Sequence, residues 1–333
     1  MKVLYSFLTV IVLILVALIG ANITNLHYVF GIIIPYLALV MFVGGFVYRV
    51  VKWGKSPVPF RIPTTIGQQK SLPWIKQNKI ENPTSSFYVV VRMAMEILFF
   101  RSLFRNTKTE LREGENGPHL AYGSAKWLWL GSLLFHWSFL IILLRHLRLF
   151  LDPIPSFVQL LESVDGMLQI GLPQLYLTDM FILVALTFLF LRRVCIPKVK
   201  YISLPADYFP LFMLMSVAIS GILMRYFYKV DLIAVKQLAI GLATFQPVLP
   251  SDIGPMFFIH IFLVSVLFAY FPVSKLMHMG GIFMSPTRNM MNNNRMVRHI
   301  NPWNPEVEVH TYEQYEDEFR EKMKKAGIPV EKE

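Results

Sequence analysis

Long apolar stretches constrain the fold of this chain more than any other feature of its sequence. A helix needs about 20 predominantly apolar residues to cross a bilayer, and six stretches approach or exceed that length. They predict transmembrane spans at residues 3–22, 28–51, 123–150, 174–195, 204–226 and 253–278. Because 55% of the 333 residues are hydrophobic, we expect an all-α, polytopic membrane bundle of six transmembrane helices.

The distribution of Lys and Arg predicts how the bundle is oriented. The segment 52–126 holds twelve of these residues, whereas the segment 151–172 holds none. Cytoplasmic loops carry the excess of positive charge in membrane proteins. We therefore expect a multi-pass protein of the cell inner (cytoplasmic) membrane with both termini in the cytoplasm. The net charge of +11 then reflects cytoplasmic loops, and no motif for nucleic-acid binding is present.

Two segments outside the spans are predicted to form helices. Residues 85–104 are apolar but carry Arg92 and Glu96, which are four apart and can pair on one helix face. We interpret this segment as an interfacial helix on the cytoplasmic surface rather than a seventh span. In the tail, Thr311 and Gln314 have the spacing of a capping box. They precede an apolar stripe predicted to dock on a partner, formed by Tyr312, Tyr315, Phe319 and Met323.

Two predicted spans carry two histidines each. His260 and His278 are separated by 18 residues, which places them about 27 Å apart and on one face of an undistorted helix. His136 and His146 are ten residues apart on the span 123–150. Antiparallel packing would face His136 with His278 and His146 with His260. The axial spacings differ by about 12 Å, so a bend is required, and Pro272 is the expected place for it.

These opposed pairs predict bis-histidine ligation of two b haems, because neutral imidazole is a common haem ligand. A single intramembrane histidine could simply bond to a neighbouring helix, but two pairs at matched ends favour haem. Neither His-bearing span contains a carboxylate, which disfavours a di-metal site. The competing class is a transporter with a histidine proton relay, which we would expect to show internal repeats. Cys195 is the only cysteine, so this chain alone cannot hold an iron–sulfur cluster.

Charged residues near His146 are candidates for further roles. Arg145 and Arg148 could extend to lipid headgroups, or could pair with haem propionates and steer a quinone. The outer-side carboxylates are candidate acceptors for the protons of a quinol, and they are Glu162, Asp165 and Asp179. Asp179 ranks first because it lies about two turns into a predicted span, where a charge needs a specific reason.

The spacings His-x9-His and His-x17-His, with FPVSKLMH at residues 271–278, resemble those of the cytochrome b subunit of respiratory nitrate reductases. The resemblance covers about residues 123–285. It implies that His146 and His260 bind an outer haem, that His136 and His278 bind an inner haem, and that quinol is oxidised beside the outer one. The loop after His146 lacks the Lys that this family places near its quinone, so those quinone contacts do not transfer.

The tail from His310 to Lys332 is similar to that of the DsrM family, the membrane cytochrome b subunits of the sulfite-reduction-associated Dsr complex. This resemblance implies menaquinol as the electron donor and a role in dissimilatory sulfate or sulfite reduction. It also implies a cytoplasmic iron–sulfur partner like DsrK, which passes electrons toward the DsrC trisulfide, and further Dsr complex subunits. The chain would then be the quinol-oxidising electron-transfer subunit of a membrane oxidoreductase complex.

These expectations divide the chain into four parts. Residues 1–52 form an N-terminal two-helix hairpin, and residues 53–121 form a basic cytoplasmic segment with the interfacial helix. Residues 122–285 form a four-helix dihaem cytochrome b domain, and residues 286–333 form a cytoplasmic tail.

The charge pattern yields a testable topology. Reporter fusions or protease accessibility should place Glu115 and Glu333 in the cytoplasm and Glu162 outside. If Glu115 and Glu162 were found on the same side of the membrane, residues 85–104 would have to span it and the six-span topology would be wrong.

Overall fold

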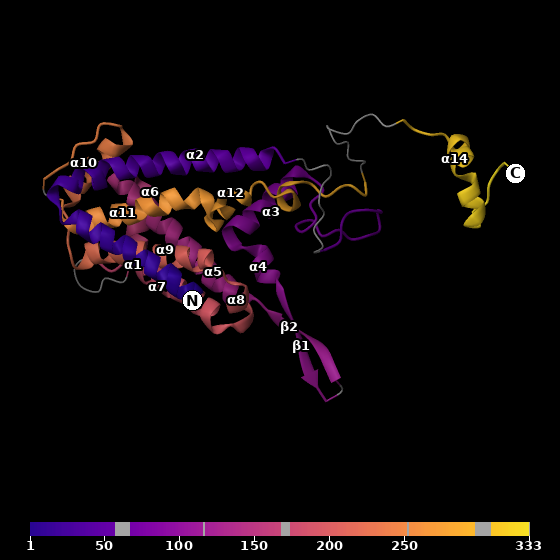
Figure 1. Ribbon diagram of the computed structural model, residues 1–333, viewed down its shortest axis with the longest axis horizontal. Helices are drawn as coiled ribbons and strands as arrows, with labels where there is room; N and C mark the ends of the chain where they lie inside the picture. Colours follow the sequence, from indigo (N-terminus) through magenta and orange to yellow (C-terminus); the bar gives the residue numbers. More distant parts are fainter. Residues whose placement is uncertain (57–66, 116, 168–173, 252, 297–307, 333) are drawn as a thin grey trace.

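The computed structural model describes residues 1–56, 67–115, 117–167, 174–251, 253–296 and 308–332. Long helices lie side by side in an elongated bundle, and smaller elements extend from one end of it (Figure 1). The long helices are α1 (Lys2–Ala21), α2 (Ile34–Gly54), α5 (Lys126–His146), α7 (Leu177–Cys195), α9 (Pro205–Tyr226) and α11 (Pro255–Tyr270).

Shorter elements connect and extend the long helices. They are η1 (Thr24–Leu26), η2 (Val29–Ile33), α3 (Ser86–Phe99), α4 (Arg101–Arg105), η3 (Leu147–Leu149), α6 (Ser156–Asp165), α8 (Pro197–Ile202), α10 (Leu232–Ala243), η4 (Phe271–Val273), η5 (Lys275–Met277), α12 (His278–Gly281), α13 (Pro286–Asn289) and α14 (Tyr312–Lys325), with strands β1 (Thr107–Gly114) and β2 (Gly117–Ser124).

Five helical segments among the described residues are long and apolar enough to cross a membrane. They are Lys2–Ala21, Thr24–Gly54, Lys126–Leu149, Pro205–Tyr226 and Pro255–Val273. α7 has 19 residues but carries a charge near its start and two near its end, at Asp179, Arg192 and Arg193. The chain is therefore a mostly helical, multi-pass membrane protein, and a sixth span formed by α7 stays a prediction.

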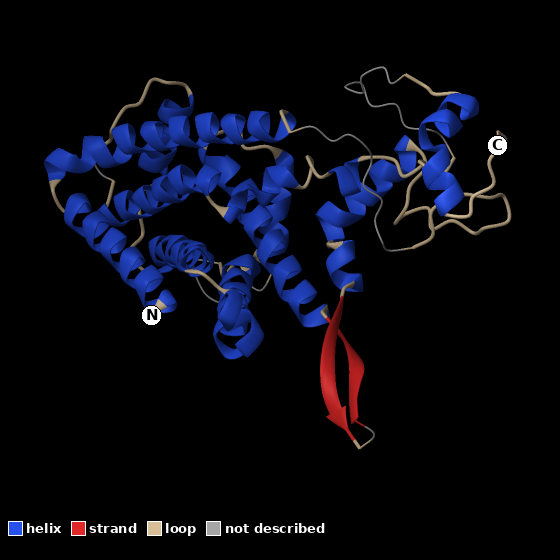
Figure 2. Cartoon of the chain, turned by 45° about the vertical axis from the view of Figure 1, so that its right-hand side comes forward, coloured by secondary structure: helices blue, strands red, loops and turns tan. Residues whose placement is uncertain are grey.

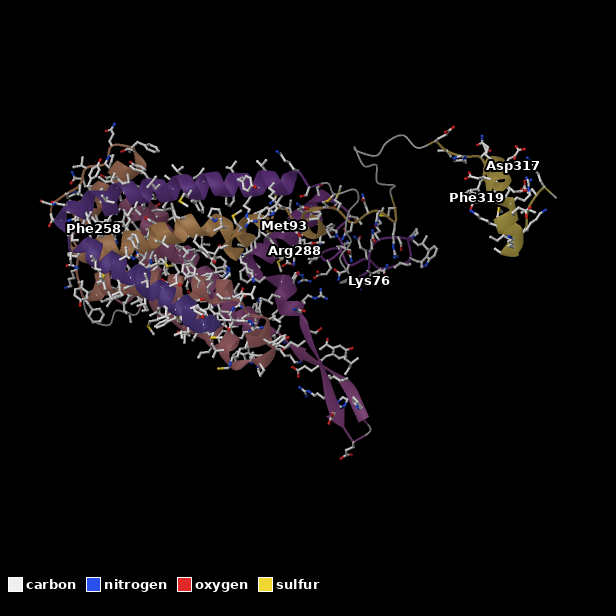
Figure 3. All side chains as sticks on the ribbon, in the orientation of Figure 1. Lys76, Met93, Phe258, Arg288, Asp317 and Phe319 are labelled. Carbon is white, nitrogen blue, oxygen red and sulfur yellow. The ribbon has the colours of Figure 1, made fainter. Side chains whose placement is uncertain are left out.

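α11 lies at the centre of the bundle, where it packs against α2, α9 and α1, while α7 joins α9 to α5. In the most apolar stretch of Pro255–Val273, which contains α11, 44% of the residues are buried. The corresponding share in Lys126–Leu149, which contains α5, is 6%. Phe258 of α11, near the left end of the bundle in Figure 3, is almost fully buried and stacks on His27 with ring centroids 4.2 Å apart. α11 therefore organises the core, whereas α5 lies at the periphery of the chain.

The last predicted span is not one continuous helix, so His260 and His278 do not share one straight helix. α11 ends at Tyr270, and η4 carries Pro272, which cannot donate a backbone hydrogen bond. Ser274 is extended, and its hydroxyl accepts a bond from the Leu276 amide to start η5. His278 begins the separate helix α12. The interruption falls at Pro272, where the sequence predicted a bend.

The segment 85–104 is broken by Phe100, which adopts a left-handed conformation with φ of 49° between α3 and α4. At 14 residues, α3 is about 21 Å long and is not one of the candidate spans. Arg92 and Glu96 are both buried on one face, and Glu96 attracts the Arg92 guanidinium electrostatically, but the hydrogen bonds of Glu96 go elsewhere. Glu96 instead accepts bonds from the backbone and hydroxyl of Ser102 and holds the first turn of α4.

Residues 107–124 form an antiparallel hairpin that extends away from the bundle (Figure 2). The all-α expectation is therefore wrong for this part of the basic segment. Tyr122 pairs with Thr109 and Leu120 with Leu111, and such β-branched, aromatic and aliphatic pairs favour strands. Gly117 follows the turn with φ of 92°, a conformation that glycine adopts readily.

The C-terminal helix α14 lies apart from the bundle in Figure 1, with Asp317 and Phe319 labelled in Figure 3. Its predicted capping box is confirmed, because Thr311 and Gln314 bond reciprocally. Buried Glu316 accepts bonds from the amides of Glu331 and Lys332, each at 2.8 Å. The Glu331 amide in particular holds the pKa of Glu316 below its usual value. These two hydrogen bonds join residues 331 and 332 to α14.

Candidate functional site

The structure brings the four predicted histidines together as two pairs. The rings of His136 and His278 have centroids 5.9 Å apart and planes at 83°. His146 and His260 lie close enough for their rings to interact electrostatically. The first pair is at the end of the bundle that carries α4 and the hairpin, here called the hairpin end. The second pair is at the opposite end, where η3 packs against α10, here called the α10 end (Figure 1).

Each histidine has its Nδ1 engaged in a local hydrogen bond. In α5, Nδ1 of His136 donates to the Ser132 carbonyl and Nδ1 of His146 to the Ile142 carbonyl, both at 2.7 Å. Nδ1 of His278 donates to the Lys275 carbonyl at 2.9 Å. A carbonyl can only accept, so these three rings carry their proton on Nδ1. In the neutral ring Nε2 is then the unprotonated nitrogen, which is the one that binds a metal.

In the fourth ring, His260, Nδ1 contacts a serine hydroxyl instead of a backbone carbonyl. Nδ1 of His260 lies 2.8 Å from the Ser220 hydroxyl of α9. The hydroxyl has one proton, and when that proton is donated to the Val217 carbonyl at 2.9 Å, the serine oxygen accepts from Nδ1 of His260. Ser220 was not a predicted site residue, because a serine in an apolar span resembles any small helix-packing residue. It is nevertheless the group that selects the His260 tautomer.

The paired rings fit a haem iron held from both faces. An iron bound by two imidazole nitrogens at about 2 Å each would hold the ring centroids about 6 Å apart, close to the 5.9 Å between His136 and His278. Two of the rings are half-buried and two are exposed. Within the described residues, α5 packs mainly on α7, and α11 packs on α2, α9 and α1. His146 and His260 therefore lie on helices that pack mainly on other helices, and His278 lies beyond α11, at the start of α12.

Aromatic and small residues border the rings. The edges of Phe100 and Phe135 contact His136 with centroids 4.9 and 5.0 Å away. A Cβ at Gly221 would lie 3.4 Å from Cε1 of His260, so a larger residue there would crowd this ring. Among the described residues no three His, Cys, Asp or Glu side chains converge on a common metal position.

Arg145 lies at the centre of a buried ionic network beside His146. Its guanidinium is 2.9 Å from Asp179 and 3.2 Å from Asp165. Asp165 also accepts from the amide and hydroxyl of Thr178 at 2.9 and 2.6 Å. Arg145 is only 7% exposed and Asp165 5%, so this arginine does not extend to lipid headgroups. Its charge is balanced inside the chain instead.

An aromatic platform extends this network. The ring of Tyr176 lies between two guanidiniums, with Arg145 and Arg225 each 3.8 Å from its centroid. The Tyr226 hydroxyl donates to Asp179 at 2.9 Å and accepts from the Tyr176 amide at 3.1 Å. These tyrosines and Arg225 were not among the predicted site residues. The only indication in the sequence was Arg225, a charged residue at the end of the predicted span 204–226. A count of Lys and Arg in the connections assigns that residue to a loop.

Arg148 and Glu162 form a separate ion pair at 2.9 Å, with side chains 35% and 19% exposed. The structure therefore places the three candidate carboxylates near His146 but in different environments. Asp165 and Asp179 share the buried Arg145, whereas Glu162 is paired nearer the surface. Both candidate arginines have carboxylate partners of their own.

A family model described as nitrate reductase gamma subunit matches residues 86–299, the part of the chain that contains all four histidines. The chain belongs to this family. The resemblance to nitrate reductase cytochrome b subunits is thereby confirmed.

Two curated relatives cover most of the chain, and each is named Hdr-like menaquinol oxidoreductase cytochrome b-like subunit. The relative from Archaeoglobus fulgidus is 46% identical over 284 residues, which is 83% of this chain and 84% of the relative. The one from Archaeoglobus profundus is 44% identical over 283 residues, 83% of both chains. Neither carries the DsrM name, so that narrower identification stays a prediction.

The buried network predicts a difference between the two arginines. Arg145→Gln leaves Asp165 and Asp179 buried beside a neutral side chain, so we expect it to lower the free energy of unfolding by about 3–5 kcal/mol. Arg148→Gln breaks a half-exposed pair and should cost about 1 kcal/mol or less. Thermal and detergent-denaturation curves of the purified variants would measure both. Equal losses in the two variants would contradict the central role of Arg145.

Proposed function

We propose that this chain is a dihaem cytochrome b, the quinol-oxidising subunit of a membrane oxidoreductase complex. The carrying observation is that two pairs of histidines each have Nδ1 engaged in a hydrogen bond, which leaves Nε2 of each ring for a metal. His146 and His260 would hold the outer haem, and His136 and His278 the inner haem. When bound, each haem b supplies a one-electron carrier between quinol and the partner subunit.

The proposed arrangement has six spans, with α7 as the sixth, in the cytoplasmic membrane. Its charges near the two ends, at Asp179 and at Arg192 and Arg193, lie where a spanning helix can keep them paired or near water. Both termini and the hairpin end face the cytoplasm in this topology, and the α10 end faces outward. The distribution of Lys and Arg in the sequence supports it.

Menaquinol is the proposed donor, because the two relatives are named as subunits of menaquinol oxidoreductases. Quinol oxidation releases two electrons and two protons, so the site needs groups that take protons outward. The carboxylates beside His146 supply them, with Asp179 as the first candidate and Asp165 and Glu162 as the others. Asp179 accepts hydrogen bonds from Arg145 and from the Tyr226 hydroxyl, and these two donors hold the carboxylate in position.

Arg145 and Arg148 take positioning roles in this proposal. Arg145 holds Asp165 and Asp179 in place next to His146, and its remaining surface stacks on Tyr176. Arg148, which is partly exposed, is the better candidate of the two for contact with a haem propionate or a quinone. This assignment follows because Arg145 is buried between two carboxylates, whereas Arg148 pairs with Glu162 and is partly exposed.

The proposed electron acceptor is a cytoplasmic iron–sulfur subunit like DsrK, within a complex that includes other Dsr subunits and serves dissimilatory sulfate or sulfite reduction. The chain has a single cysteine, Cys195, so the next redox centre has to lie on another polypeptide. The Hdr-like oxidoreductase names of the relatives support membership in a multi-subunit complex. The resemblance of the tail to DsrM supports the narrower assignment.

Haem content tests the ligand assignment. We expect two b haems in the parent protein and one in His136→Ala or His278→Ala, with the inner haem lost. His146→Ala and His260→Ala should each lose the outer haem instead. The pyridine haemochrome assay and the b-type spectrum measure this. His119→Ala, on the exposed hairpin, is the matched control and should retain both haems. Two haems in all four ligand variants would overturn the assignment, and a parent without a b-type spectrum would favour the transporter.

Stopped-flow reduction tests the quinol site. Asp179→Asn should slow haem reduction by a menaquinol analogue by about 100-fold, because general-base groups contribute on that order. Asp165→Asn and Glu162→Gln should have smaller effects, and dithionite should reduce all variants normally because it needs no proton acceptor.

The control for the quinol test is Asp152→Asn, which removes an outer-side carboxylate that is 73% exposed and pairs with Lys236. Its reduction rate should match that of the parent. We also expect quinone-analogue inhibitors to perturb the outer haem spectrum first. Parent rates in all three carboxylate variants, or an inhibitor that shifts only the inner haem, would contradict the proposed site.

A further inference from the structure

His278 differs from the other three histidines because it lies outside the long helices. The helix that carries His260 ends at Tyr270, and two short 3-10 turns separate it from His278. Nδ1 of His278 donates to the carbonyl of Lys275. The orientation of this ring therefore depends on where the segment 271–278 places the backbone of Lys275.

Two other helices hold that segment. From α2, Nε of Arg49 donates to the carbonyl of Pro272 at 2.9 Å. From α9, Asp207 accepts a bond from Nζ of Lys275 at 2.6 Å. The segment is thus anchored at its first turn by an arginine and next to the histidine by an ion pair.

The Asp207 carboxylate is itself fixed. Its side chain is only 6% exposed, and its second oxygen accepts from the Leu204 amide at 2.9 Å. The guanidinium of Arg193 lies 4.0 Å away. A buried carboxylate with these partners cannot follow Lys275 if that residue moves, so it acts as a rigid anchor.

The partners of the other histidines differ in kind. His136 and His146 donate to carbonyls four residues earlier in their own helix, so the helix alone sets their orientation. His260 is within α11 and donates to Ser220. Among the four, His278 is the ring whose hydrogen-bond acceptor is held in place by an ion pair to another helix.

We infer that the Asp207–Lys275 ion pair is a clamp that sets the ring orientation of His278 relative to His136. The clamp acts through the backbone of Lys275, so Asp207 and Lys275 are positioning residues. This inference rests on the proposed function. It assigns to these two residues control of the axial ligand geometry, and hence the electronic properties, of the inner haem.

The principal variant is Lys275→Met, because Lys275 is 68% exposed on its side chain and its loss leaves the Asp207–Leu204 bond intact. Asp207→Asn removes the charge but keeps an oxygen that can accept from Leu204. The double variant completes a cycle, and Lys275→Arg is the conservative rescue. The matched control is Lys236→Met, which breaks a comparable ion pair with Asp152 at 3.1 Å at the α10 end.

Two measurements on the holoprotein separate positioning from simple charge effects. They are the EPR spectrum of the oxidised protein and a redox titration of the inner-haem potential. Charge alone would lower the inner-haem potential in Lys275→Met, which loses a cation, and raise it in Asp207→Asn, which loses an anion. It would leave the ligand geometry unchanged. A clamp instead shifts the low-field EPR signal of the inner haem in the same direction in both single variants, because both release the same segment.

We expect that common EPR shift, an equal shift in the double variant, and recovery in Lys275→Arg, with the outer-haem signal and Lys236→Met unchanged. Loss of the inner haem alone in Lys275→Met would also support the clamp. An unchanged inner-haem EPR signal in Lys275→Met, or opposite shifts in the two single variants, would overturn it. Haem content of His278→Ala, measured in parallel, distinguishes this failure from failure of the proposed function: a variant that keeps two haems refutes the ligand assignment itself.

Discussion

A ring N–H placed among apolar side chains must find an acceptor, and this requirement determines the chemistry of the four histidines. Three rings satisfy it with a backbone carbonyl and the fourth with the hydroxyl of Ser220. A neutral ring that donates from Nδ1 keeps its lone pair on Nε2. The bonds that satisfy the imidazoles in the bundle are therefore compatible with the proposed role of these rings as metal ligands.

Charges in the bundle follow a related rule, and they gather at its ends. At the α10 end, Arg145 balances Asp165 and Asp179, and its place next to His146 ties the end of α5 to α6 and α7. At the hairpin end, Asp207 balances Lys275 beside His278. Buried ions need close partners to offset desolvation. As a result, each histidine pair has an ion pair nearby that links the surrounding elements.

The parts of the fold that could be predicted are those with a local cause. Apolar length predicts the spans, Pro272 predicts the helix interruption, and the spacing of Thr311 and Gln314 predicts the start of α14. The hairpin at 107–124 was missed because its strands are polar and exposed, so no hydrophobic alternation marks them. The sequence predicted the attraction between Arg92 and Glu96, but not that Ser102 of the following helix donates hydrogen bonds to Glu96.

By itself, the sequence determined that this chain is a membrane helix bundle and which histidines could meet, because apolar length and residue spacing are properties of the chain alone. Only the tertiary structure decided which nitrogen of His260 is free, through Ser220 on another helix. It also decided which carboxylates Arg145 neutralises, and that Asp207 anchors the turn before His278. Those outcomes depend on contacts between residues 20 to 68 positions apart, and no local pattern encodes such contacts.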